Sequence, residues 1–239
     1  SIVSKTVKVL DNSVFGFKEL AGCKIFLKEH QLRTIMRCLQ EKKCRVMLAD
    51  EVGMGKTIEA ASVLKVYLLH NSNRRILIAV PRPLIAQWRA ELLIKFEIIP
   101  ENNINNNYVE LVAEEDIEKY TNSRWDFVIA DEAHKIKENR TSQSKAMHHL
   151  GDQARYKLLL TGTLITNKEL DVFSQYRFLN KEIFGTSFYA FRSRYFDMCG
   201  YGNHIPVFRK QMMDEFLQKL HSVAYRCLLY TSPSPRDCS

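Results

Sequence analysis

A glycine-rich run that ends in lysine and threonine, DEVGMGKT at residues 50–57, has the residue types that hold nucleotide phosphates. An apolar run precedes it and a helical pattern follows it, which is the setting that a phosphate-binding loop requires. Gly53 and Gly55 would let the backbone approach a phosphate chain closely, and the helix amino terminus would add N–H donors. Lys56 would bring a positive charge to the β- and γ-phosphates, and the Thr57 hydroxyl would face Mg²⁺. The ligand expected here is ATP with Mg²⁺.

Two adjacent carboxylates follow a second apolar run, FVIA, in the motif DEAH at residues 131–134. A carboxylate at the tip of a strand can hold Mg²⁺ through water, which is the role expected of Asp131. The next carboxylate, Glu132, is suited to polarise the water that attacks the γ-phosphate. An acidic turn between a strand and a helix is the alternative, and it loses favour because a phosphate loop precedes the pair in the same chain.

A third polar motif, TGT at residues 161–163, directly follows the apolar run KLLL. Alone it would be an ordinary turn after a strand. After a phosphate loop and DEAH, its hydroxyls are placed to link the γ-phosphate region with a nucleic-acid track.

The elements that must position these motifs alternate between short apolar runs and helical patterns. The predicted strands are Val46–Ala49, Ile76–Val80, Tyr108–Val112, Phe127–Ala130 and Lys157–Leu160, and the predicted helices include Thr57–His70 and Leu84–Phe96. Such alternation predicts an α/β fold with a parallel sheet flanked by helices. Each motif comes just after a strand, at the sheet edge where ligands bind in such folds.

The remaining segments carry weaker signals. Asn102–Asn107 is predicted to be a polar surface loop, and Glu110–Glu118, with five acidic residues, a solvated face. From residue 168 to 226 the chain is expected to be helical, with an amphipathic helix over Met212–Tyr225. The basic and aromatic residues of Arg192–Tyr201 would either follow DNA or form a solvated helix face. His148 and His149 are expected to be ordinary surface residues.

The amino-acid composition excludes some classes of protein but does not by itself indicate a function. The chain has 239 residues, 46% of them hydrophobic and 26% charged, with a net charge of +8. This balance favours a folded protein and, weakly, a polyanionic partner. The six cysteines form no C-x-x-C pair and no zinc-ligand spacing. No apolar run reaches the about 18 residues that span a bilayer, so no membrane partner is expected.

These motifs, in this order, resemble the first RecA-like lobe of the Snf-type DNA-dependent ATPases of helicase superfamily two. That family includes chromatin remodellers and RapA-like bacterial proteins. The resemblance covers about residues 25–226. Its further carriers are HQL at His30–Leu32, VPRPLIAQWRAEL at Val80–Leu92, ELDVFSQYRFLNKEIFG at Glu169–Gly185 and FLQKLHSVAYR at Phe216–Arg226. Asp50, where phosphate loops in general have glycine, is normal for this family.

The resemblance implies a RecA-like fold with a helical C-terminal extension, in which Gln31 reads adenine and His134 bridges motifs of the nucleotide site. The implied nucleotide site is Gln31, Asp50, Glu51, Val52, Gly53, Met54, Gly55, Lys56, Thr57 and His134. Lys56 and Glu132 are the implied catalytic residues, and Thr57 and Asp131 the implied metal ligands. The implied DNA or coupling residues are Pro81, Gln87, Trp88, Thr161, Gly162 and Thr163, although an apolar core anchor is the favoured role for Trp88.

Two departures from the family pattern concern the DNA side of the lobe. Leu164 stands where the family usually has proline after TGT, which leaves the conformation of that loop open. The segment between NNINNN and DEAH is short and holds no clear second DNA-contact motif.

The implied function is ATP hydrolysis coupled to movement on double-stranded DNA, with a protein–DNA complex or RNA polymerase as a further partner. The expected location is the bacterial or phage nucleoid in the cytoplasm, or the nucleus in a eukaryote. An RNA helicase or a restriction-type helicase is the first alternative, and DEVGMGKT, TGT and the QW pair disfavour it. The second is a nucleotide-binding module without turnover, because such motors complete their site with an arginine from a second lobe.

The two ends of the chain are expected to be unnatural boundaries. Ser1 is not an initiator methionine, and Cys227–Asp237 matches one reading frame of a transposase sequencing adapter. The expected organisation is a flanking segment (1–24), the ATP-binding lobe (25–180), a helical extension towards a missing second RecA-like lobe (181–226) and a non-native tail (227–239).

Overall fold

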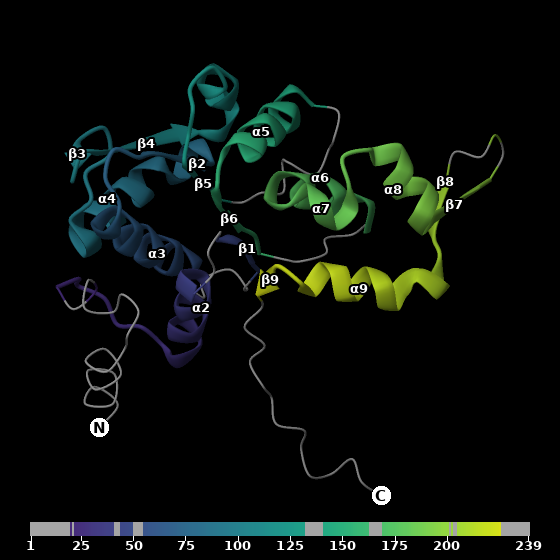
Figure 1. Ribbon diagram of the computed structural model, residues 1–239, viewed down its shortest axis with the longest axis horizontal. Coiled ribbons are helices and arrows are strands. Elements are labelled where there is room, and N and C mark those ends of the chain that lie inside the picture. Colours follow the sequence, from purple (N-terminus) through teal and green to yellow (C-terminus); the bar gives the residue numbers. More distant parts are fainter. Residues whose placement is uncertain are drawn as a thin grey trace, which may run out of the picture.

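A seven-stranded sheet forms the centre of the molecule, in a computed structural model that describes residues 20, 22–40, 44–49, 55–131, 141–162, 169–200, 202 and 205–225 (Figure 1). Six strands are parallel, in the order β4-β2-β5-β6-β1-β9, and β3 pairs antiparallel with β4 at the edge. The strands are β1 (Arg45–Leu48), β2 (Arg75–Val80), β3 (Asn103–Ile104), β4 (Asn107–Ala113), β5 (Phe127–Ala130), β6 (Tyr156–Leu160) and β9 (Ala224–Tyr225).

Helices cover both faces of this sheet. One face carries α2 (Glu29–Gln40), α3 (Lys56–His70) and α4 (Ile85–Phe96), and the other carries α5 (Ser142–Gln153) and α6 (Val172–Leu179) (Figure 1). The chain continues through α7 (Lys181–Phe184), α8 (Phe188–Tyr195) and α9 (Met213–His221), with short 3-10 turns η2 (Arg82–Leu84), η3 (Glu114–Tyr120), η5 (Glu169–Asp171) and η6 (Lys210–Met212). None of the helices in these described parts is long and apolar enough to cross a bilayer.

The apolar strands are buried on both faces, which explains why their sequences are continuously apolar. Successive side chains of a strand point to opposite faces. In β2, Ile76 and Ile78 accordingly pack against α2–α4, whereas Leu77 packs in the second core, against α5 and α6. The predicted α/β fold with a helix-flanked parallel sheet is confirmed, and the predicted strands agree with the observed ones to within a residue at each end.

The predicted polar loop at Asn102–Asn107 is a tight hairpin instead, in which β3 turns back into β4. Asn105 and Asn106 have φ of 52° and 60°, in the left-handed region that a two-residue hairpin turn needs and that asparagine tolerates. Asn107 is fully buried, and its side-chain amide donates to the backbone oxygens of Leu68 (2.9 Å) and Asn71 (2.6 Å). Asn107, at the end of this polar run, therefore helps to hold the hairpin against the end of α3.

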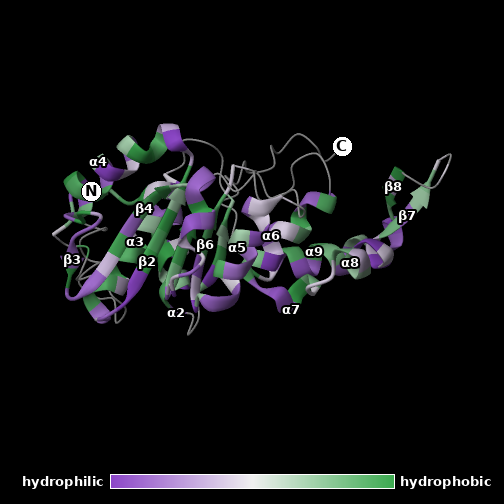
Figure 2. Cartoon of the chain, turned by 90° about the horizontal axis from the view of Figure 1, so that it is seen from above, coloured by the Kyte–Doolittle hydropathy of each residue, from purple (hydrophilic) through white to green (hydrophobic). Residues whose placement is uncertain are grey.

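The stretch predicted to be helical after residue 168 contains a β-ribbon. Its strands are β7 (Phe196–Cys199) and β8 (Ile205–Phe208), which pair antiparallel and project from one end of the molecule (Figure 2). The predicted helix Met212–Tyr225 stops at His221, because β9 then joins the sheet beside β1.

An aromatic cluster holds the C-terminal helices against the sheet. The Phe184 ring lies 5.3 Å from that of Phe191 and 5.4 Å from that of Phe216, between ring centroids. These rings share one continuous core with Met47 of β1. The extension consequently belongs to the same packed unit as the sheet.

Candidate functional site

Three of the predicted motifs meet at one edge of the sheet, because their strands are neighbours. β5, β6 and β1 lie side by side, and Asp131, Thr161 and the loop before α3 follow their carboxyl ends. The backbone N–H of Thr161 donates to the oxygen of Leu48 at the end of β1 (2.9 Å). This edge is where ligands bind in open α/β sheets.

Part of each motif lies outside the described residues, and the roles predicted for that part stay predictions. These residues are Asp50, Glu51, Val52, Gly53 and Met54 of the phosphate loop, Glu132 and His134 of DEAH, and Thr163 of TGT. The predicted non-native tail, residues 227–239, also lies outside them.

The last residues of the phosphate loop have the expected geometry. Gly55 has φ 88° and ψ 28°, a left-handed conformation that favours glycine, and α3 begins at the next residue. As the N-cap, Gly55 has no side chain to accept from the first-turn amides, which leaves the helix end suited to an anion. Lys56 is buried and Thr57 half-buried in the first turn of α3.

Gln31 of α2 packs directly against this turn. A Cβ added to Gly55 would lie 2.3 Å from Nε2 of Gln31, so a larger residue there would displace the end of that side chain. Gln31 is 4% exposed, and its Oε1 accepts a hydrogen bond from the backbone N–H of Lys28 (2.9 Å). Gln31 of the Q segment and Gly55 of the phosphate-loop motif, more than 20 residues apart in the sequence, are thus neighbours in the fold.

Replacing Gly55 by alanine should destabilise the lobe by about 1–2 kcal/mol for the left-handed backbone alone, and further for the contact with Gln31. The displaced Gln31 should also weaken ATP binding. Melting temperature and ATP affinity are measured for Gly55→Ala, Gln31→Ala and the double variant. In the double variant the contact is gone, so its loss of stability should be smaller than the sum of the single losses. Additive losses would contradict the packing of Gln31 on Gly55.

Asp131 is buried at the end of β5 and is held by a tryptophan of α4. The indole Nε1 of Trp88 donates to Oδ2 of Asp131 (2.7 Å), and the two residues are 1% and 7% exposed. Trp88 thus lies in the core, where an anchor would lie, and its grouping with the DNA contacts stays a prediction.

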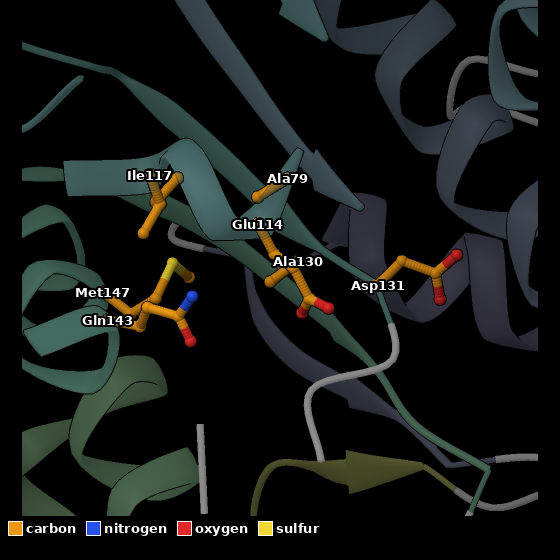
Figure 3. A pocket seen from close by; sticks show the side chains of 7 residues that line it. All are labelled: Ala79, Glu114, Ile117, Ala130, Asp131, Gln143 and Met147. Carbon is orange, nitrogen blue, oxygen red and sulfur yellow. The ribbon is translucent and has the colours of Figure 1, made fainter. Parts of the chain in front are cut away.

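A small pocket lies beside Asp131 at the carboxyl ends of β2 and β5. It is lined by Ala79, Glu114, Ile117, Ala130, Asp131, Gln143 and Met147. Figure 3 shows that the Asp131 carboxylate turns away from Met147 and Gln143. The metal-ligand candidate is thus directed away from the α5 side of the sheet.

The other predicted DNA or coupling residues occupy different environments. Pro81 directly follows β2 and begins the turn into α4, and Gln87 is exposed, its amide donating to Oε1 of Glu91 (3.1 Å). Thr161 is buried and Gly162 half-buried. Gln87 can be reached from solvent, and the burial of Thr161 restricts it to an indirect role.

The acidic residues of η3 lie at the solvated surface, whereas His148 differs from the sequence prediction. Asp116 of η3 pairs there with Arg82 (2.8 Å) and Lys119 (2.7 Å), and Glu115 and Glu118 are exposed. His148 is not an ordinary surface residue, because its Nε2 contacts the hydroxyl of Ser174 (2.8 Å), linking α5 to α6. Burial lowers the pKa of His148 to about 4, so the ring is neutral at pH 7 and structural.

The donor set at this edge fits Mg²⁺ with a nucleotide. Within the described residues no cluster of three or more His, Cys, Asp or Glu side chains could hold a metal by itself. Mg²⁺ in nucleotide sites takes only one or two carboxylates and completes its shell with phosphate oxygens and water. Asp131 and the Thr57 hydroxyl, beside a glycine-lined helix end, match that requirement.

Comparison with known proteins gives a consistent result. Residues 28–101 and 95–233 match the family described as the SNF2-related domain. The "Uncharacterized ATP-dependent helicase YqhH" of Bacillus subtilis is 36% identical over 157 residues, which cover 61% of this chain and 28% of that protein. The "RNA polymerase-associated protein RapA" of Yersinia enterocolitica is 29% identical over 190 residues, 69% of this chain and 20% of the relative. The chain thus spans between a fifth and a third of these relatives.

Solved structures share the fold. The "SWI2/SNF2 ATPase core in complex with dsDNA" of Sulfolobus solfataricus superposes with a TM-score of 0.71 at 21% identity, over 87% of this chain and 45% of that one. The ATPase core domain of the same organism, described without DNA, gives 0.68 at 23% identity. The fold of this chain matches less than half of each core.

Proposed function

The chain belongs to the SNF2-related family, and from that membership we propose that it is the ATP-binding lobe of a DNA-stimulated ATPase that moves along double-stranded DNA. The observation that carries the proposal is the convergence of Gly55–Thr57, Asp131 and Thr161 at the carboxyl ends of three neighbouring strands. This arrangement supports phosphate, metal and coupling roles for these residues.

The roles proposed within the lobe follow from the residue chemistry. Lys56 and the amides of the first turn of α3 would hold the phosphates, and Thr57 and Asp131 would hold Mg²⁺, which neutralises phosphate charge when bound. Glu132 would accept a proton from the attacking water. Gln31, which lies beside Gly55, would hydrogen-bond the base, and His134 would connect the motifs.

The DNA side of the proposal depends on the segment after β2 and on the basic charge. Pro81 precedes α4, and Gln87 lies in the first turn of that helix and is exposed. A motor that steps over any sequence must contact mainly the phosphate backbone, which suits the net charge of +8. Thr161, Gly162 and Thr163 would pass a change at the γ-phosphate to this track.

A second RecA-like lobe would complete the site. The relatives are longer than the region matched here, and motors of this kind use an arginine from outside the phosphate-loop lobe for the transition state. The similarity to RapA, described as RNA polymerase-associated, supports a protein–DNA complex or RNA polymerase as a further partner. The proposed location is the bacterial or phage nucleoid in the cytoplasm, or the nucleus in a eukaryote.

ATP hydrolysis by this lobe together with a second lobe should rise on adding double-stranded DNA and should rise little with RNA. Affinity for DNA should fall steeply with salt and depend little on base order, because phosphates supply most contacts. The measurement is steady-state phosphate release with duplex DNA, single-stranded DNA and RNA at several salt concentrations. Equal stimulation by single-stranded RNA would favour an RNA helicase instead.

A further inference from the structure

The hydrogen bond between Trp88 and Asp131 is the polar contact that ties α4 to the candidate metal site. The indole Nε1 lies 2.7 Å from Oδ2, and the contact joins residues 43 positions apart. A buried indole N–H needs an acceptor, and a buried carboxylate needs a donor. Each group therefore fixes the other.

The second tryptophan of the chain shows that this pairing is not a general need of buried tryptophans. Trp125 is also 1% exposed, and its indole N–H donates to the backbone oxygen of Tyr120 (2.9 Å). A backbone carbonyl is thus a sufficient acceptor for the buried indole N–H of Trp125. At Trp88 the acceptor is instead the carboxylate of Asp131 at the tip of β5. This is the carboxylate that the proposed function assigns to Mg²⁺.

Two hydrogen bonds hold Asp131, one at its main chain and one at its side chain. Its backbone N–H donates to the oxygen of Ala79 (2.9 Å), which fixes the main chain beyond β5, and the indole then fixes the carboxylate. Trp88 itself is held in the core with Leu92 and Phe96 of the same helix. The donor cannot move unless α4 moves.

We propose that Trp88 is a positioning residue for the Asp131 carboxylate, orienting it to hold Mg²⁺ with the nucleotide. The inference rests on the proposed function, since it needs Asp131 to be a metal ligand. Hydrogen-bond partners of metal ligands fix the orientation of the ligand, and their removal typically costs about 10–100-fold in metal affinity. Trp88 thereby links the segment that follows β2 to the metal site.

The test compares Trp88→Phe with Trp125→Phe in this chain. Both variants remove a buried indole N–H and similar volume, but only the first removes the donor to Asp131. Mn²⁺ affinity is measured by electron paramagnetic resonance with a non-hydrolysable ATP analogue, and folding by circular dichroism. Trp88→Phe should bind Mn²⁺ about 10–100-fold more weakly, and Trp125→Phe should bind it like the wild type. Equal affinity in folded Trp88→Phe would overturn the proposal.

A second measurement does not depend on the folding of Trp88→Phe. In Trp125→Phe the only tryptophan is Trp88, because the chain has two. Mn²⁺ with the analogue should quench its fluorescence, and adding Asp131→Asn should abolish the quenching. Absent quenching in a protein that binds Mn²⁺ would overturn the proposal. Absent binding of Mn²⁺ and analogue by the wild type would instead defeat the proposed function.

Discussion

Replacing Glu132 by glutamine should lower the rate of ATP hydrolysis about 10²–10⁴-fold while ATP still binds. The amide keeps the size of the side chain but cannot accept the proton of the attacking water. Asp131, the preceding residue, lies at the tip of β5, whose neighbour β6 pairs in turn with β1, the strand that precedes the phosphate-loop motif. The measurement is ATP affinity alongside phosphate release on double-stranded DNA, with the second lobe present.

The matched control for this variant is Glu118→Gln. Glu118 is an exposed glutamate of η3, so the same chemical change there should leave hydrolysis unchanged. Loss of ATP binding in a folded Glu132→Gln protein would mean that Glu132 has a structural role instead of a catalytic one.

Replacing Lys56 by alanine should lower turnover about 10²–10³-fold, the cost of removing one preorganised group that stabilises transition-state charge. Lys56 is the first residue of α3 and is 9% exposed, next to the left-handed Gly55. Lys56 therefore lies in the helix turn that is proposed to bind the phosphates. ATP affinity is measured by titration of this chain, and turnover in the presence of the second lobe.

Lys65→Ala is the control on the same helix. Lys65 lies further along α3, and its Nζ donates to the backbone oxygen of Phe96 (2.8 Å). That variant loses a lysine and a hydrogen bond without touching the phosphate end, so it should lower stability and keep nucleotide affinity. Turnover at the wild-type level in Lys56→Ala would remove Lys56 from the site.

The sheet and the positions of the motifs could be predicted from sequence because the signals are local. β5 is apolar at each of its four positions, as a strand buried on both faces must be, and Asp131 marks its end. The left-handed Gly55 followed by a helix is likewise contained in a few residues. Each of these features depends on residues that are close in the sequence, so the local order of residue types predicts it.

Contacts between distant segments could not be predicted in this way. Nothing near Trp88 indicates that its indole would find Asp131, because the pairing depends on how α4 packs across β2 and β5. The burial of His148 against Ser174 is a similar case. The β7–β8 ribbon was missed because its two strands have only four residues each and the first directly follows α8, so no long alternating pattern marks them.

The two-residue strand β3 has a consequence for how the molecule behaves in a crowded solution. An open sheet edge offers unpaired N–H and C=O groups to any other chain, and long apolar edges promote aggregation. Here the edge beyond β4 is closed by only Asn103 and Ile104 before the chain turns back at Asn105. The hairpin thereby occupies the pairing groups at the start of β4, at Asn107 and Tyr108, and keeps a second molecule from adding a strand at that end of the sheet edge.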